Sequence, residues 1–218
     1  MKTKLGFLQW LMMLMLLASA PGAWAQVGTL TQTGAMTVCM NSTEPFGVIP
    51  TAGSVYTWTI IAGTGGMGTI INGPAPNNLI SVNWTSSGSC TLQVFETNAT
   101  CTGNPVDITV TVLPGLLPGT AAADQTICYN GIPLPITSTA PTGGDGTYTH
   151  QWESSIDGGT TWEVVAGAAS LSYAPGALTQ TTLYHLIHTS GGSCGIVTTN
   201  TVTITVLPQI STSPIWHR

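Results

Sequence analysis

Apolar and polar residues alternate one by one in short runs along most of the chain. The clearest run covers residues 107–113, where β-branched aliphatic residues occupy every second position, and it recurs at residues 201–207. Strict period-two alternation predicts strands with one face in a core and the other in water. Each run ends at a proline, Pro114 or Pro208, which cannot donate to a β-ladder and therefore ends the strand.

The landmarks upstream of these two runs also repeat. A cysteine, Cys39 or Cys128, is followed by an aromatic-rich strand, residues 56–60 or 148–152, and then by a second cysteine before the closing strand. Matching landmarks at similar spacing indicate two tandem modules of one general kind.

Turn signals rich in glycine, serine and asparagine recur about every 8–12 residues, and an alternating strand is expected at residues 79–84. This rhythm predicts an all-β chain of two tandem immunoglobulin-like β-sandwiches. We expect the first sandwich at residues 26–114, a semi-rigid linker at 115–119, the second sandwich at 120–208 and a tail at 209–218.

The only long apolar block lies at the N-terminus. Lys2 and Lys4 precede an apolar run at residues 5–17, and Ala23-Trp24-Ala25 follows it. This pattern is typical of a secretory signal peptide at residues 1–25, since the run is shorter than the ~20 residues that span a bilayer. We therefore expect a secreted protein with no membrane span after cleavage.

Charge is scarce, at 5% of all residues. Cleavage would remove both lysines and leave Arg218 as the one basic side chain besides histidine, so nucleic acid is excluded as a partner. No nucleophile motif such as G-x-S-x-G is present, so we expect no enzyme activity and no cofactor.

Several polar and aromatic residues are candidates for a functional site. Residues 155–162 fit an Asp-box pattern, which we interpret as a hairpin turned at Asp157-Gly158. His185 and His188 are three apart in a strand, so they should point to opposite faces, and no metal site is expected. We expect His150 to occupy a core or interface position. Glu153 and Glu163 should face each other across the hairpin. Trp162 and Trp216 should be available to a ligand or an interface.

The two modules resemble domains of one class of bacterial surface protein. The first resembles the PKD-like domains of Bacteroidetes surface proteins through Cys39, Tyr56-Thr57-Trp58, residues 80–84, Glu96-Thr97-Asn98 and Cys101-Thr102-Gly103. The second, through residues 151–162 and 173–179, is similar to the Ig-like repeats of adhesins and gliding-associated proteins.

The resemblance implies export by the type IX route, for which such proteins carry a C-terminal sorting domain. This chain ends at Arg218, before such a domain, so we expect either a stand-alone subunit or the N-terminal part of something longer.

The cysteines lie at equivalent places in the two modules of an exported chain. This predicts one disulfide in each module, Cys39–Cys101 and Cys128–Cys194. Cys90 is left over, and three interpretations stay open: a buried free thiol, an intermolecular bridge, or a replacement for Cys39 or Cys101 in the first bridge.

Two functional classes remain. The first is an extracellular structural or adhesive protein that associates with itself or with other surface proteins, because its sheet edges lack the charges that usually block strand addition. Residues 26–33 or 210–216 would then complete a neighbour's sheet. The alternative is a surface module that binds carbohydrate or another ligand, with glycans stacking on exposed tryptophans.

Overall fold

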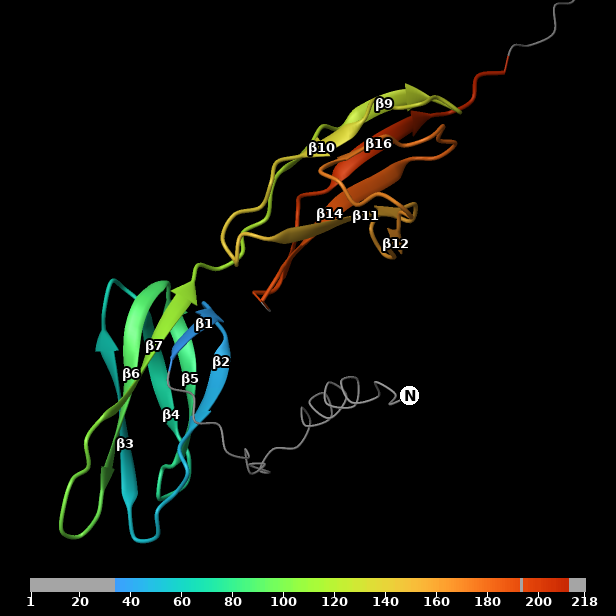
Figure 1. The fold of residues 1–218 in the computed structure, drawn as a ribbon. Helices are drawn as coiled ribbons and strands as arrows, with labels where there is room; N and C mark the ends of the chain where they lie inside the picture. The colour runs from blue at the N-terminus through green and yellow to red at the C-terminus, as the bar shows by residue number, and fades with distance from the viewer. Residues whose placement is uncertain (1–33, 193, 212–218) are drawn as a thin grey trace, which may run out of the picture. The chain divides into compact units, whose positions relative to one another are not determined.

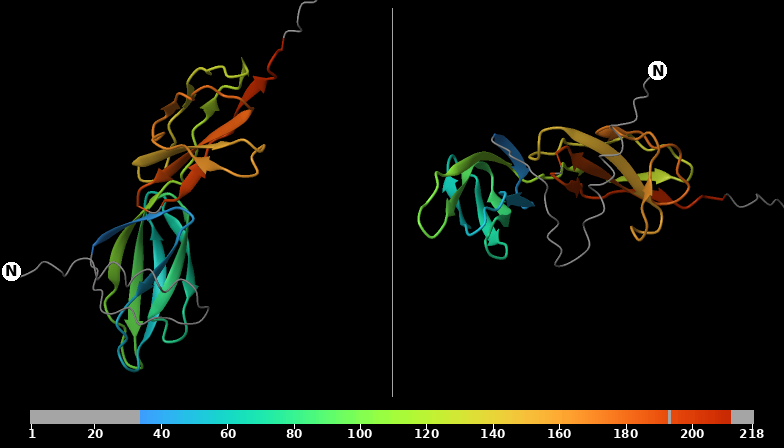
Figure 2. Two further views of the ribbon diagram at one scale, coloured as in Figure 1. Left: turned by 90° about the vertical axis from the view of Figure 1, so that its right-hand side faces the viewer. Right: turned by 60° about the horizontal axis from the view of Figure 1, so that its bottom comes forward.

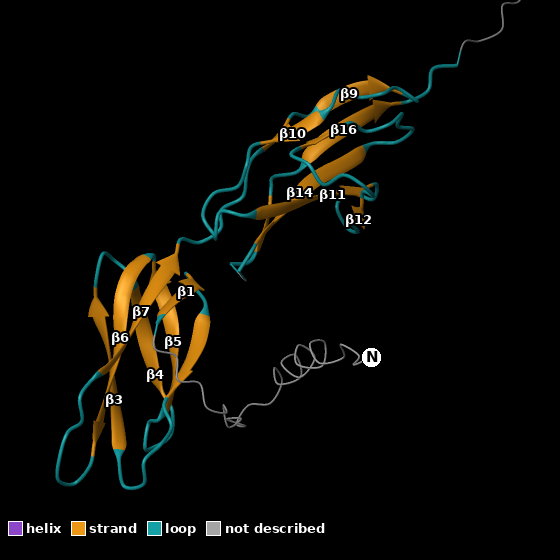
Figure 3. Cartoon of the chain, viewed as in Figure 1, coloured by secondary structure: helices purple, strands orange, loops and turns teal. Residues whose placement is uncertain are grey.

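The computed structural model describes residues 34–192 and 194–211. Every regular element in this part of the chain is a strand, and loops and turns connect the strands (Figure 3). Those up to Leu113 are β1 (Ala35–Cys39), β2 (Thr43–Gly47), β3 (Val55–Ala62), β4 (Met67–Asn72), β5 (Leu79–Ser86), β6 (Gly88–Thr97) and β7 (Val106–Leu113). Those after it are β8 (Ala121–Ala122), β9 (Gln125–Cys128), β10 (Ile136–Ser138), β11 (Tyr148–Ser155), β12 (Glu163–Val164), β13 (Ser172–Tyr173), β14 (Thr182–Ser190), β15 (Ile196–Thr198) and β16 (Val202–Leu207).

Strands β1 to β7 form a sandwich of two sheets (Figure 1). One sheet has the order β1-β7-β6-β3 and the other the order β2-β5-β4. β1 runs parallel to β7, whereas the other neighbours are antiparallel. The chain passes from one sheet to the other between β1 and β2, β2 and β3, β3 and β4, and β5 and β6.

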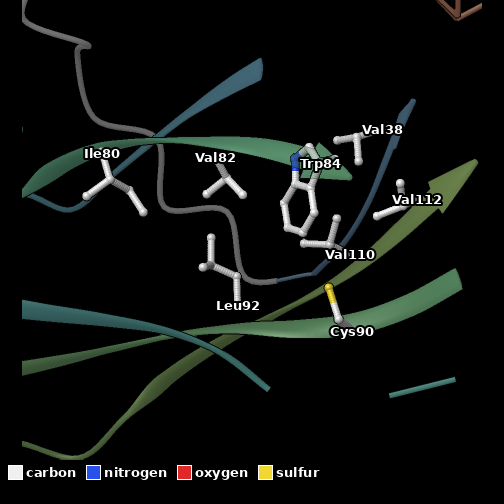
Figure 4. Packing of buried hydrophobic residues seen from close by; sticks show 8 residues of the cluster. All are labelled: Val38, Ile80, Val82, Trp84, Cys90, Leu92, Val110 and Val112. Atoms are coloured by element: carbon white, nitrogen blue, oxygen red, sulfur yellow. The ribbon is translucent and has the colours of Figure 1, made fainter. Parts of the chain in front are cut away.

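The core of this first sandwich follows from the alternation in its central strands. Ile80, Val82 and Trp84 take every second position of β5 and are fully buried, while the residues between them are more exposed. They pack against the inner face of β6 and β7 (Figure 4). The buried cluster consists of Val38, Ile80, Val82, Trp84, Cys90, Leu92, Val110 and Val112.

Strands β8 to β16 form a second sandwich, which Figure 2 shows in green-yellow to red. Its larger sheet has the order β12-β11-β14-β16-β9, with β15 paired to β14, and its smaller sheet has the order β13-β10-β8. β9 runs parallel to β16, as β1 does to β7. The buried cluster consists of Ala121, Ile136, Trp152, Ala168, Tyr184, Leu186, Val202 and Ile204.

The fold class expected from the sequence is confirmed: the chain is all-β and contains two tandem immunoglobulin-like sandwiches. The strand expected at residues 79–84 is β5, and the repeated runs at 107–113 and 201–207 are β7 and β16. The residue boundaries proposed for the two domains and the linker stay predictions.

The predicted signal peptide, residues 26–33 and the end of the tail from residue 212 lie outside the described residues. Within residues 34–192 and 194–211, no helix is long and apolar enough to cross a membrane.

Candidate functional site

The cysteines are paired differently from the sequence prediction. Cys39 is bonded to Cys194, with their Cα atoms 5.2 Å apart, while Cys101 and Cys128 are free. Both predicted bridges, Cys39–Cys101 and Cys128–Cys194, are therefore wrong.

The length of the strands explains why the predicted pairs cannot form. Cys39 lies beside Leu113 at the end of β7, whereas Cys101 precedes the start of that strand at Val106. An eight-residue strand is roughly 25 Å long, far beyond the Cα separation of about 4.4–6.8 Å that a disulfide spans.

The second sandwich separates its two cysteines in the same way. Cys128 pairs with Leu207 at the end of β16, on the side where β14 begins, whereas Cys194 follows the end of β14. The nine residues of β14 place roughly 30 Å between these two levels.

Cys90 belongs to the core. Its side chain is 2% exposed among the inner residues of β5, β6 and β7, and its thiol is free. Burial raises the pKa of this thiol, so the reactive thiolate is disfavoured. Of the three interpretations, the structure has the buried free thiol, and an intermolecular bridge at Cys90 is wrong because no second chain can reach it.

The free thiols of Cys101 and Cys128 are exposed. Cys101 lies in the connection between β6 and β7, where the Oδ1 atom of Asn98 accepts hydrogen bonds from the backbone N–H groups of Thr100 and Cys101, both at 3.0 Å. The backbone N–H of Asn98 donates to the Cys101 carbonyl at 3.0 Å. These bonds hold a tight polar turn with the thiol on its surface.

Cys128 instead lines a groove beside the end of β16. The groove has a volume of about 690 Å³ and is apolar along much of its wall. Tyr129, Leu207 and Ile210 contribute to it and are 43%, 46% and 88% exposed. The groove is lined by Cys128, Tyr129, Asn130, Leu207, Pro208, Gln209 and Ile210.

The hairpin expected at Asp157-Gly158 is present as a turn after β11. The Oδ1 atom of Asp157 accepts from the backbone N–H groups of Thr160 and Thr161 at 3.0 and 2.9 Å and from the Ser155 hydroxyl at 2.7 Å. Bonds to Thr161, and then to Ser155 and Thr160, hold the pKa of the Asp157 carboxyl well below its usual range. The side chain acts as a turn cap, as the sequence pattern predicted.

Trp162 follows this turn and lies over the outer face of β14. Its ring stacks on His185 with the ring centres 3.7 Å apart, and its Nε1–H donates to the Gly159 carbonyl at 3.1 Å. The Nε2 atom of His185 lies 3.0 Å from Oε2 of Glu153. The three side chains form a half-buried cluster, so one face of Trp162 is not available to a ligand.

The expected pairing of Glu153 with Glu163 is wrong. The register sets Glu153 opposite Val164 and places Glu163 opposite Ser154. Glu153 instead contacts His185 on the neighbouring strand. Sequence alone could not supply this register, because a shift of one residue moves a side chain to the other face.

The histidines of β14 point to opposite faces, as predicted: His188 is fully buried, and His185 lies on the outer face with Trp162. His150 faces His188 across β11 and β14, with their Nδ1 atoms 2.9 Å apart. Burial and the nearby His150 lower the pKa of His188. In the described part of the chain, no group of three or more histidine, cysteine, aspartate or glutamate side chains could hold a metal ion. Trp216 lies outside the described residues.

Edge strands β1, β3 and β4 lack the charges and prolines that usually block pairing with another chain, and β3 is the longest of them. β3 is eight residues long, has no charged residue and no proline, and bonds only to β6 within the sheet. The backbone N–H of Tyr56 points to the open side, where it donates to the Pro76 carbonyl. Because backbone groups alternate sides along a strand, those of Trp58, Ile60 and Ala62 face the same side. β3 therefore offers an edge for strand addition.

A family model of undefined function matches part of this chain. The model described as "Domain of unknown function (DUF8696)" matches residues 117–208, which is less than half of the chain. This match covers the predicted second sandwich and names no activity. No curated protein matches the chain.

Solved structures with a similar fold include a titin fragment with three immunoglobulin domains, which is 10% identical with a TM-score of 0.41, and extracellular domains 3–5 of Drosophila OTK, which are 15% identical with a TM-score of 0.43. The match to the titin fragment covers 79% of this chain and 62% of the titin chain. The match to OTK covers 82% of this chain and 61% of the OTK chain. The fibronectin(III)-like modules of Clostridium thermocellum CbhA are 12% identical with a TM-score of 0.35, covering 86% of this chain and 97% of theirs. Because these TM-scores are below 0.5, we infer nothing about function from them. The PKD-like and Bacteroidetes assignments stay predictions.

Proposed function

We propose that this chain is an extracellular, non-enzymatic structural subunit whose copies assemble into a surface filament by strand addition. Edge strand β3 carries the proposal, since the backbone groups of Trp58, Ile60 and Ala62 face its unpaired side along an uncharged stretch. The Cys39–Cys194 disulfide supports an extracellular setting, because disulfides persist in oxidising compartments. In this proposal the first sandwich is a PKD-like domain and the second an Ig-like repeat of a Bacteroidetes adhesin.

We assign the incoming strand to residues 26–33 of a second copy. This stretch has eight residues, like β3, and contains neither charge nor proline. The alternative donor, residues 210–216, contains Pro214, which lacks the N–H that a ladder requires. Main-chain hydrogen bonds would supply the affinity, and alternate side chains would set the register.

Charges on the edge test the proposal. Replacing Thr57 and Thr59 together by lysine places two cations on the exposed face of β3, where an added strand would have to desolvate them. We expect electron microscopy of the mature protein to show filaments for the wild type and none for this variant.

The matched control replaces Thr109 and Thr111 by lysine. These threonines are also exposed, but they lie on β7, which is already paired on both sides. This control should still form filaments. Monomeric wild-type protein at high concentration, or filaments of the β3 variant, would disprove strand addition at β3.

Glycan binding is a second candidate, favoured by Trp162. Its ring is held rigidly by His185 and Gly159 and is only half-buried, so the uncovered face could stack on a sugar. Binding on a glycan array that is lost in a folded Trp162→Ala variant would support this function. A wild-type protein that binds no glycan would exclude it.

A further inference from the structure

Cys101 and Cys128 have exposed free thiols. Each lies at the end of its sandwich opposite the end that carries a cysteine of the Cys39–Cys194 bridge. In the first sandwich, Cys39 lies at the end of β7 and Cys101 before its beginning. In the second, Cys194 follows the end of β14, and Cys128 lies level with its beginning. Each sandwich therefore carries one bonded cysteine at one end and one exposed thiol at the other.

The two thiols sit on surfaces of opposite form. Cys101 tops a tight turn, which Asn98 holds through its side chain and backbone. The turn is continued toward the strands by a hydrogen bond from the Gly103 N–H to the Glu96 carbonyl at 2.8 Å. Cys128 lines a groove of about 690 Å³. An exposed turn can enter a groove on another copy, whereas two grooves cannot fill each other.

Neither surface carries a charge. Residues 98–105, which connect β6 to β7 and include the turn, and all residues that line the groove are uncharged. Exposed apolar groups accompany both, with Val106 53% exposed at the base of the turn and Ile210 88% exposed at the groove. Contact between them would bury apolar surface without desolvating an ion.

We propose that the Cys101 turn of one copy enters the Cys128 groove of a second copy and that the two thiols form an intermolecular disulfide. The occupant is a second copy because this chain itself carries the complementary exposed thiol. A contact between two different surfaces is heterologous, so it repeats from copy to copy and builds an open chain, or a ring where the rotation closes, instead of a two-fold dimer. This inference rests on the proposed function as a self-assembling subunit, and it adds a covalent lock between copies.

The bond forms by two exchange steps with a small-molecule disulfide as the oxidant. The Cys128 thiolate attacks one sulfur of the oxidant, which forms a mixed disulfide and releases one thiol. The Cys101 thiolate of the second copy then attacks the Cys128 sulfur and releases the second thiol. Two protein thiols lose two protons and two electrons, and the oxidant is reduced to two thiols.

Oxidised glutathione tests the bond on mature protein whose Cys39–Cys194 bridge is intact. We expect a ladder of covalent multimers on a non-reducing gel, and its collapse to monomer on reduction. Proteolytic fragments should contain Cys101 joined to Cys128.

Single variants decide between unlike and like pairs. Cys101→Ser alone and Cys128→Ser alone should each stay monomeric, and an equal mixture of the two should give dimers and nothing longer. Serine is close in size to cysteine at these exposed positions, and circular dichroism checks that both variants fold. The proposal would be overturned if either variant alone formed covalent dimers. It would also be overturned by a Cys101–Cys128 bond within one chain, or by a wild-type protein that forms no multimers.

The same proteins separate this inference from strand addition. Suppose that filaments form under a reducing agent and that oxidised glutathione produces no covalent multimers. This result would overturn the Cys101–Cys128 bond and still support strand addition. The opposite result is also possible. Covalent multimers of the variant with lysine at positions 57 and 59 would support the Cys101–Cys128 bond. A wild-type protein that forms no filaments under a reducing agent would disprove strand addition.

Discussion

His188 is a buried histidine whose second ring nitrogen has no partner. It is fully buried, its Nδ1 atom lies 2.9 Å from Nδ1 of His150, and its Nε2 atom makes no hydrogen bond. One ring of the pair must donate and the other must accept across this contact. A proton added to His188 would place an unsolvated cation in the interior next to His150.

The stability of the second sandwich should therefore fall in mild acid. The pKa of His188 is lowered in the folded protein, so below about pH 6.5 the unfolded chain binds a proton that the folded chain refuses. Stability is complete above that pH and is lost as pH falls toward the folded pKa, by at most about 1.4 kcal/mol per pH unit for one proton.

Urea unfolding between pH 7.5 and pH 5 measures this dependence. In a His188→Gln variant, which does not titrate, the slope should be shallower than in the wild type. Equal slopes for the two proteins would show that His188 takes up its proton as readily in the folded state as in the unfolded state.

Strand β5 shows what alternation supplies to a whole element. Ile80, Val82 and Trp84 were placed on one face by their spacing alone, and the structure buries all three (Figure 4). Trp84 is the largest of them and meets Phe46 of β2 edge to face, with the ring centres 6.1 Å apart.

Removal of the Trp84 side chain should therefore destabilise the first sandwich strongly. Trp84→Ala opens a cavity in the core, and we expect a loss of about 3–5 kcal/mol in the free energy of unfolding. Trp162→Ala is the matched control, because it removes the same side chain from a half-buried site on the second sandwich. Urea denaturation followed by circular dichroism should show a clearly smaller loss for the control. Similar losses would mean that Trp84 is not the main core anchor.

Alternation did not reveal how the elements pair. The parallel pairs β1–β7 and β9–β16 each join an early strand of a sandwich to its last strand, and no local pattern distinguishes parallel from antiparallel neighbours. The register between β11 and β12 was missed for the same reason, and with it the contact of Glu153 with His185.

The whole molecule contains one disulfide among its described cysteines, and this bond lies outside both core clusters. Neither Cys39 nor Cys194 belongs to either buried cluster. The bond joins residues 155 positions apart, one from each set of strands. Its role is therefore to restrain the chain between the sandwiches rather than to hold either core.

Reduction should thus leave each sandwich folded. We expect the near-ultraviolet circular dichroism of the buried tryptophans to persist and the melting temperature to change by less than about 4 °C, the shift that ~1 kcal/mol causes in a small domain. A Cys39→Ser variant without reductant should behave in the same way. Unfolding of either sandwich on reduction would show instead that its core depends on the bridge. Peptide mapping of the oxidised protein provides the check that Cys39 is joined to Cys194.

Local chemistry was enough to identify strands β3, β5, β7, β11 and β16, the two repeated units, the buried faces of β5, β7 and β16 and the turn capped by Asp157. These features depend on period-two alternation and on short-range hydrogen bonds, which can be recognised in the order of residues. Other features depend on which strands lie side by side and on which end of a strand each residue occupies. These are the partners of the cysteines, the contacts of Glu153 and Trp162, and the unpaired edge of β3. Residues far apart in the chain meet only when the sheets form, so folding alone brought Cys39 to Cys194 and left Cys101 and Cys128 exposed.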